Sequence, residues 1–308
     1  MHWSDLRAVR LDVREVGLRD GLQIESPVPL EAKLRLVEAI VATGIRRVEV
    51  TSFVSPRAVP ALADAAQLAE HLNRWPDIHW SALIANPRGA QRSIAAGIAN
   101  VEYVISASDG HSIANAGKKT SEALAATSEV CEQIHEAGGT VEVIVATAWD
   151  CPFDGPTPPQ RLIDIVAAAV GAGADAISLA DTIGTVTPAR LAAAVSDVGR
   201  LVRPDQIGLH LHDTRGSGQV NVLAGVLAGV RKFDASVGGL GGCPFAPGAS
   251  GNIATEELAY WTQGSPIDSG IDVDRAVEAA AVAQDVVGHP LLGSLLRAGG
   301  RSRPRPRS

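Results

Sequence analysis

The chain has 308 residues, of which 46% are hydrophobic, 20% charged and 4% aromatic, a composition typical of a globular protein with one large domain or two small ones. Its formal net charge of −7 argues against a broad nucleic-acid-binding surface, because contacts with phosphates require clustered Lys and Arg. No run of about 18 apolar residues occurs, and the N-terminal stretch lacks the apolar core of a signal peptide, so we expect a soluble protein without membrane contacts. The three cysteines, Cys131, Cys151 and Cys243, are widely spaced, which favours a reducing, cytoplasmic location.

Short β-rich segments alternate with longer Ala- and Leu-rich segments along the chain. We predict eight strands, over residues 9–16, 46–51, 78–84, 101–106, 140–146, 176–180, 207–211 and 232–237. Helices are expected between them, several with Pro near the first turn and Gly after the last, for example over 30–43, 121–138, 158–173 and 188–202. This alternation is typical of βαβ units and a parallel sheet.

Eight β/α pairs within about 260 residues favour a TIM (β/α)8 barrel, an α/β fold. A doubly wound open sheet is the alternative, because alternation alone does not show that the sheet closes. We expect residues 253–298 to form further C-terminal helices that cover one end of the barrel. No linker rich in Pro, Gly or Ser divides the chain, so residues 1–298 are predicted to form a single catalytic domain. Residues 299–308, with four arginines among Ser and Pro, are predicted to be a disordered basic tail.

Polar and Gly-rich segments follow most of the predicted strands. They include GLRDGLQIE after the first strand, SASDGHSIANAGKKT after the fourth, HDTRG after the seventh and GGLGGCPFAPGASGN after the eighth. Active sites of TIM barrels lie at the end of the barrel where the strands end. The sequence therefore predicts that its chemistry is gathered at that end.

The seventh predicted strand ends in HLHD, with His210 and His212 one residue apart. Alternate residues of a strand point to the same side, so the two imidazoles can converge on one ion, although one core and one surface histidine would have the same spacing. Closure of the barrel would bring Asp20, after the first strand, close to them, and Asn252 follows the eighth strand. Two imidazoles and two oxygen donors suit Mg²⁺ or Mn²⁺, while Zn, Co or Fe would also bind. The structural alternatives are a turn residue for Asp20 and a helix N-cap for Asn252.

The Gly-rich segment around Cys243 does not match a dinucleotide-binding fingerprint, because Pro244 stands where the last glycine is required. We interpret it as a mobile loop in which Cys243 could act as a general acid near the metal. The alternative for this cysteine is burial as a small apolar residue.

Five segments together resemble the 3-hydroxy-3-methylglutaryl-CoA (HMG-CoA) lyase family, barrel metalloenzymes related to isopropylmalate and homocitrate synthases. They are REVGLRDGLQIE, VEVTSFVSP, SLADTIGT, HLHDTRG and VGGLGGCPFAPGASGNIATEEL, and the resemblance covers residues 10–262. It implies the barrel fold, an acyl-CoA substrate, a divalent metal and cleavage of a 3-hydroxyacyl-CoA by retro-Claisen chemistry. In the lyase proper the products are acetyl-CoA and acetoacetate.

The resemblance also implies roles for individual residues. The positions that match the family's metal ligands are Asp20, His210, His212 and Asn252. Arg19 matches a catalytic arginine that stabilises the enolate oxygen, and Cys243 matches a loop cysteine that assists proton transfer. Acidic positions that line and support the pocket are matched by Glu49 and Asp181. We further predict that Gln23 and Arg215 contact the substrate.

The chain departs from the family pattern on the expected active face. Arg215 replaces an aromatic residue, Ile24 replaces Asn, and Trp149 with Asp150 replaces a Phe-Gly pair. These changes could reshape the acyl pocket, and Arg215 could contact a carboxylate or a CoA phosphate. The acyl group is therefore less certain than the reaction type.

Other functions stay open at this point. They are cleavage of citramalyl-CoA or of a longer 3-substituted glutaryl-CoA, condensation of acetyl-CoA with a 2-oxo acid, hydrolysis by a metal-bound water, and binding without catalysis. A homo-oligomer is plausible from the family, but no apolar pattern identifies an interface.

Overall fold

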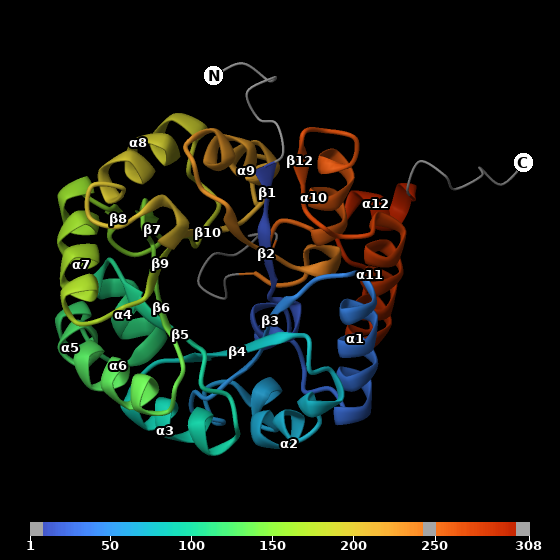
Figure 1. Ribbon diagram of the computed structural model, residues 1–308, viewed down its shortest axis with the longest axis horizontal. Coiled ribbons are helices and arrows are strands. Elements are labelled where there is room, and N and C mark those ends of the chain that lie inside the picture. Colours follow the sequence, from blue (N-terminus) through green and yellow to red (C-terminus); the bar gives the residue numbers. More distant parts are fainter. Residues whose placement is uncertain (1–8, 243–250, 300–308) are drawn as a thin grey trace, which may run out of the picture.

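The computed structural model describes residues 9–242 and 251–299; residues 1–8, 243–250 and 300–308, which include Cys243 and nearly all of the predicted tail, lie outside the described part. The chain forms a closed barrel of parallel strands inside a ring of helices (Figure 1). The barrel strands are β2 (Asp12–Glu15), β3 (Arg47–Ser52), β4 (His79–Ile84), β5 (Val101–Ser106), β6 (Val141–Ala146), β9 (Ala176–Asp181), β10 (Ile207–Leu211) and β11 (Lys232–Ala235). Because β11 pairs with β2, the barrel is confirmed and the open doubly wound sheet is excluded.

The predicted strands agree with the observed ones to within one or two residues, except for the first. Residues 9–16 serve two sheets: β1 (Val9–Arg10) pairs with β12 (Ile267–Asp268), and β2 begins after Leu11. A further short hairpin, β7 (Asp150–Cys151) with β8 (Gly155–Pro156), follows β6. The first predicted strand was too long, because apolar and polar residues go on alternating from β1 into β2 although the two strands pair with different partners, β12 and β11.

Helices surround the barrel in chain order. They are α1 (Leu30–Ala42), α2 (Ala65–Ala69), α3 (Pro87–Ala95), α4 (Asp109–Ala116), α5 (Thr120–Ala125), α6 (Thr127–Glu136), α7 (Pro159–Gly171), α8 (Pro188–Val198), α9 (Gly218–Leu227), α10 (Thr255–Thr262), α11 (Val273–Val287) and α12 (Ser294–Ala298). Pro159 and Pro188 begin their helices, as expected for a residue that lacks an N–H and has its φ already set. The predicted helix over 121–138 is two helices, α5 and α6, joined at Ala126.

The predicted C-terminal helices are present, but their place differs from the expected one. Instead of covering an end of the barrel, α11 lies in the outer ring between α10 and α1 (Figure 1). The Asp272 amide donates to the Thr43 carbonyl at 2.8 Å, which ties the start of α11 to the end of α1. Among the residues described, no helix is long and apolar enough to cross a membrane.

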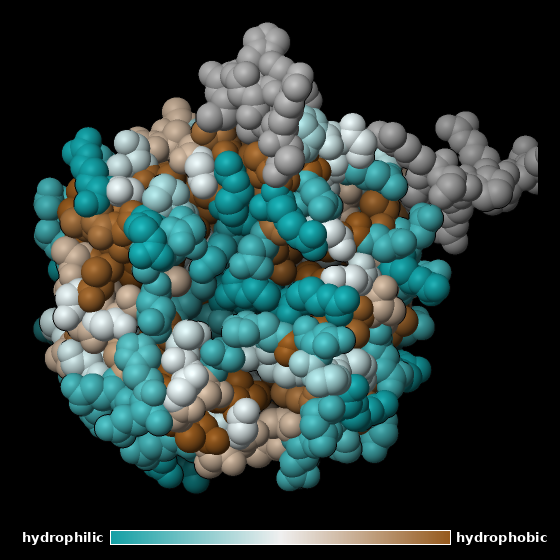
Figure 2. Space-filling model, in the orientation of Figure 1, coloured by the Kyte–Doolittle hydropathy of each residue, from teal (hydrophilic) through white to brown (hydrophobic). Residues whose placement is uncertain are grey.

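An ion-pair network fills the barrel near the starts of its strands. Arg14 is 2% exposed; it donates to Asp234 Oδ1 and to Glu142 Oε1, both at 2.8 Å, and also pairs with Glu102. Buried charges of this kind are tolerated only when they are paired and hydrogen-bonded. Figure 2 shows hydrophilic side chains around a central hollow in the face of the molecule that it presents. Charged residues, among them Arg47, Glu102 and Glu142, line a pocket near the starts of the strands.

Candidate metal centre and acyl cavity

Three potential metal ligands converge where the barrel strands end. Asp20 lies in η2 (Gly17–Gly21), a single π-helical turn directly after β2, whereas His210 lies in β10 and His212 follows it. The Nε2 atoms of His210 and His212 are 3.2 Å apart, and His212 Nε2 is 3.9 Å from Asp20 Oδ2. All three side chains are buried, and one ligand atom from each lies within 4.8 Å of the others. This geometry suits one shared cation.

Asn252 lies beside the same cluster. Its Nδ2 donates to Asp20 Oδ2 at 2.7 Å and to the Leu240 carbonyl at 3.0 Å. Its Oδ1 is buried and has no hydrogen-bond partner among the described residues. A buried carbonyl oxygen normally has a partner, and a divalent cation would supply one. The residue at the N-cap of α10 is Ala254, so the N-cap alternative for Asn252 does not hold.

Asp234, which the sequence analysis did not single out, holds the His210 ring in place. His210 Nδ1 is 3.0 Å from Asp234 Oδ2, while Arg14 binds the same carboxylate. Burial alone would raise the pKa of Asp234, but the Arg14 guanidinium and the His210 hydrogen bond hold it well below its usual range. A carboxylate on one ring nitrogen leaves the other to bind a metal, an arrangement common around metal-ligating histidines.

His212 is suited to metal binding because it is neutral. Burial, together with the neighbouring His210, lowers the pKa of His212 to about 4. A neutral imidazole keeps the lone pair that a metal requires.

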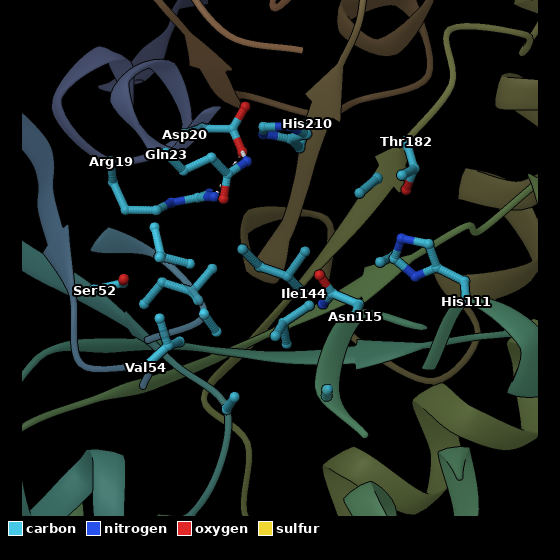
Figure 3. A pocket seen from close by; sticks show the side chains of 18 of the residues that line it. Arg19, Asp20, Gln23, Ser52, Val54, His111, Asn115, Ile144, Thr182 and His210 are labelled. Atoms are coloured by element: carbon cyan, nitrogen blue, oxygen red, sulfur yellow. Dashed lines mark hydrogen bonds and ion pairs between the residues drawn. The ribbon is translucent and has the colours of Figure 1, made fainter. Parts of the chain in front are cut away.

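Arg19 is fixed beside the cluster by two carboxylates. Its Nε donates to Glu49 Oε2 and its Nη1 to Asp20 Oδ1, both at 2.6 Å, and it is 5% exposed. Burial raises the pKa of Glu49 to about 8, against the attraction of the Arg19 charge. Gln23 Nε2 also donates to Asp20 Oδ1, at 2.8 Å, and Figure 3 shows Arg19, Asp20 and Gln23 together along one side of the cavity. The guanidinium is thus held in a single orientation.

A cavity of about 390 Å³ opens beside these groups. Its polar lining includes Ser52, whose buried hydroxyl has no partner among the described residues, and Asn115 and Thr182 on the wall away from Arg19 (Figure 3). Its apolar lining includes Leu83 and Ile144, which project from barrel strands. The cavity combines an ion-binding end with apolar and neutral polar walls.

Asp181 and Arg215 both form hydrogen bonds with the loop that follows β9. Asp181 accepts hydrogen bonds from the Thr185 and Val186 amides, at 2.9 and 3.1 Å, and Arg215 donates to the carbonyls of Ile183 and Gly184, at 2.7 and 3.1 Å. Neither is among the described residues that line the cavity. The loop that both residues contact carries Thr182, which lines the cavity.

The other departures from the family pattern also lie away from the cavity lining. Ile24 is 45% exposed, Trp149 is buried beside α8, and Asp150 pairs with Arg190. A direct effect of these three residues on the acyl pocket is therefore not seen among the described residues. Cys243 lies outside them, although its neighbour Gly242 lines the cavity.

His111 is a cavity residue that the sequence analysis missed. It lies in α4, is 4% exposed, and its Nδ1 is 2.7 Å from Ser106 Oγ. Burial lowers the pKa of His111 to about 4, so the ring is neutral at pH 7. The available signal was its place in the polar segment after the fourth predicted strand.

Comparisons with known proteins agree on one family. The family model described as HMGL-like matches residues 10–283. Hydroxymethylglutaryl-CoA lyase YngG of Bacillus subtilis is 35% identical, over 92% of this chain and 95% of that protein. An (R)-citramalyl-CoA lyase of Chloroflexus aurantiacus is 38% identical, over 92% and 93%. The solved structure of an HMG-CoA lyase from A. baumannii, in complex with coenzyme A and 3-methylmalate, has a TM-score of 0.92 and 38% identity, over 97% of this chain and 98% of that one.

Proposed function

The chain belongs to the HMGL-like family, and from that premise we propose that it is a carbon–carbon lyase that cleaves HMG-CoA, or a close analogue, to acetyl-CoA and a keto acid. For HMG-CoA the keto acid is acetoacetate. The observation that carries the proposal is the convergence of Asp20, His210 and His212 beside a fixed Arg19, at one end of an acyl-sized cavity. The relatives are HMG-CoA lyases and a citramalyl-CoA lyase, which all break this kind of bond.

We assign the divalent metal to the two histidines and two oxygen donors of the cluster. The residues that would hold it are Asp20, His210, His212 and Asn252, a set that suits Mg²⁺ or Mn²⁺. When bound, the ion would lower the pKa of the substrate's 3-hydroxyl and orient it. Asp234 contributes by fixing the His210 ring.

Arg19 is proposed to stabilise the enolate that forms when a base takes the proton of the 3-hydroxyl, the oxygen on C3 becomes the keto oxygen of the product and the bond between C2 and C3 breaks. Negative charge then develops on the thioester oxygen, where a guanidinium that is already oriented has its largest effect in a site that excludes water. Glu49 positions Arg19 through the contact at Nε. Gln23, which lines the cavity beside Asp20, is proposed to contact the substrate.

The enolate must take up a proton at C2 before the reaction reverses. We propose Cys243 as the donor of this proton; the support is that Gly242, the preceding residue, lines the cavity.

Asp181 and Arg215 are proposed to act as positioning residues, because both form hydrogen bonds with the loop from which Thr182 lines the cavity.

Citramalyl-CoA is the second candidate substrate. The observation in its favour is the 38% identity to the C. aurantiacus citramalyl-CoA lyase. Its cleavage would yield pyruvate in place of acetoacetate, with the same bond broken and the same enolate formed.

The experiment is an assay of purified protein with Mg²⁺ or Mn²⁺, in which HMG-CoA and citramalyl-CoA are offered separately and acetyl-CoA release is followed. We expect cleavage of at least one thioester and loss of cleavage with EDTA. If neither is cleaved while acetyl-CoA and a 2-oxo acid yield free CoA, the protein is a condensing enzyme and the lyase proposal is wrong.

A further inference from the structure

The floor of the cavity is apolar across three neighbouring strands. Leu83 of β4, Val104 of β5 and Ile144 of β6 all line it, and Val104 and Ile144 are direct partners in the sheet register. Figure 3 shows Ile144 in the middle of the cavity. Adjacent strands are about 4.8 Å apart, so the three side chains span about 10 Å, and most of their accessible surface belongs to Leu83 and Val104 because Ile144 is 4% exposed.

Two of these side chains, Leu83 and Val104, retain exposed surface and line the cavity. Leu83 and Val104 are partly exposed although they point into a closed barrel, whereas Ile84 and Ile105, the next residue on each strand, are 0% exposed against the helices. The exposed surface of the inner pair therefore faces the cavity. Apolar surface at that place favours an apolar group of a ligand.

The charged groups of the cavity lie at the metal end. Among its described lining residues, Arg19 is the one with a permanent positive charge, and Glu49 and Asp20 already bind it. The far wall is polar but neutral, because the pKa of His111 is lowered by burial and Asn115 carries no charge. A carboxylate on the floor would lose its hydration without gaining a charged partner. The floor is therefore suited to an uncharged branch of the acyl group.

We propose that the floor formed by Leu83, Val104 and Ile144 receives an alkyl branch at C3 that is longer than methyl. The preferred substrates would then be 3-hydroxy-3-alkylglutaryl-CoA thioesters in which the branch spans more than one strand. This inference rests on the proposed lyase function and specifies its substrate class. A methyl group would cover only part of a surface that is three strands wide.

The test uses a series of these thioesters in which the C3 branch lengthens from methyl to butyl. In full-length protein freed of metal with EDTA, where we expect no cleavage, titration calorimetry should show the Kd falling about fourfold for each CH2 added, the effect of burying one methylene group. With Mg²⁺ restored, kcat/KM for acetyl-CoA release should rise in the same order.

Substitution of Ile144 tests whether the floor is responsible. Ile144→Ala should move the preference to a longer branch, and Ile144→Val provides a milder change if the alanine variant does not fold. Ile105→Ala is the matched control, because Ile105 is buried on the outward face of β5 and does not line the cavity. It should lower the melting temperature without changing the order of preference.

A Kd that does not depend on branch length would overturn the proposal even if HMG-CoA is cleaved. Equal weakening of free CoA and of the thioesters by Ile144→Ala would also overturn it, because the pantetheine arm would then occupy the floor. If the Kd values follow the expected order but no thioester is cleaved, the proposed role of the floor in binding the alkyl branch is supported and the proposed lyase function is contradicted.

Discussion

At the scale of single residues, the sequence pattern pointed to polar side chains near the ends of strands and did not single out Asp234, which lies within one. Asp20, His210 and His212 stand out because they follow or end apolar strands in polar segments. Asp234 is the one acidic residue in KFDASV, and its role depends on contacts with His210 and Arg14 from other strands. A carboxylate between apolar residues in a predicted strand is the signal that could have found it.

Asp234→Asn tests this supporting role. The amide keeps the shape but removes the charge that fixes the His210 ring, so we expect metal affinity to fall by about 10- to 100-fold, as is typical when such a partner is changed. Isothermal titration with Mn²⁺ measures it. Glu142→Gln is the control, because Glu142 also binds Arg14 and no hydrogen bond or ion pair between it and His210 is observed. An equal loss of affinity in both variants would mean that the ion-pair network, and not Asp234 itself, sets the affinity.

At the scale of elements, the alternation of strands and helices was predictable because each strand and helix has its own hydrophobic period. The division of residues 9–16 between β1 and β2 was not, since both parts have the same period and differ only in their partners. The place of α11 beside α1 was missed for the same reason: an amphipathic helix shows that it packs, but not against which element.

The turn at Gly241 supports the candidate metal site, because its backbone lies against Asn252 and Asp20. Gly241 has a φ of 116°, and a Cβ there would lie 2.6 Å from Asn252 Nδ2 and 3.2 Å from Asp20 Oδ2. Gly241→Ala should therefore displace the two oxygen ligands and weaken Mn²⁺ binding at least tenfold, an effect of about 1.4 kcal/mol.

Gly97→Ala is the matched control for that substitution. Gly97 also has a positive φ, 82°, but a Cβ there would meet nothing within 4 Å. Gly97→Ala should lose about 1 kcal/mol of stability to backbone strain, and Gly241→Ala should lose more because its Cβ also meets Asn252, both measured by urea unfolding. Only Gly241→Ala should lose metal affinity. Unchanged Mn²⁺ binding in Gly241→Ala would show that the turn can shift without moving the ligands.

At the scale of the whole molecule, the reaction type was predictable and the substrate was not. The motifs that imply a lyase are local segments, whereas the acyl cavity is a property of the closed barrel. Leu83, Val104 and Ile144 are unremarkable apolar residues in the sequence, and only closure gives them a common surface. Conversely, Arg215 stands out in the sequence as a candidate substrate contact, whereas in the structure it donates hydrogen bonds to the carbonyls of Ile183 and Gly184.

Closure also buries two carboxyl groups, Glu15 of β2 and Glu256 of α10, which are both 0% exposed. Glu15 accepts from the Val237 amide at 3.0 Å and from Thr255 Oγ1 at 2.6 Å, and Glu256 accepts from the Gly238 amide at 2.9 Å. Burial raises the pKa of Glu15 to about 7 and that of Glu256 to about 8. In the unfolded chain both groups ionise near pH 4.5, so the folded state binds more protons between these values.

The folded state should therefore lose stability as the pH rises from 6.5 to 8, by at most about 1.4 kcal/mol per pH unit for each group that is still protonated. Below pH 6.5 an opposite effect enters, because His111 and His212 have lowered pKa values and the unfolded chain takes up their protons first. Urea unfolding of the metal-free protein at pH 6.5, 7.2 and 8.0 measures the slope. Glu256→Gln, which stays neutral, should make the slope less steep, while the raised pKa values of Glu15 and Glu49 maintain the rest. An unchanged slope in that variant would assign the pH dependence to other groups.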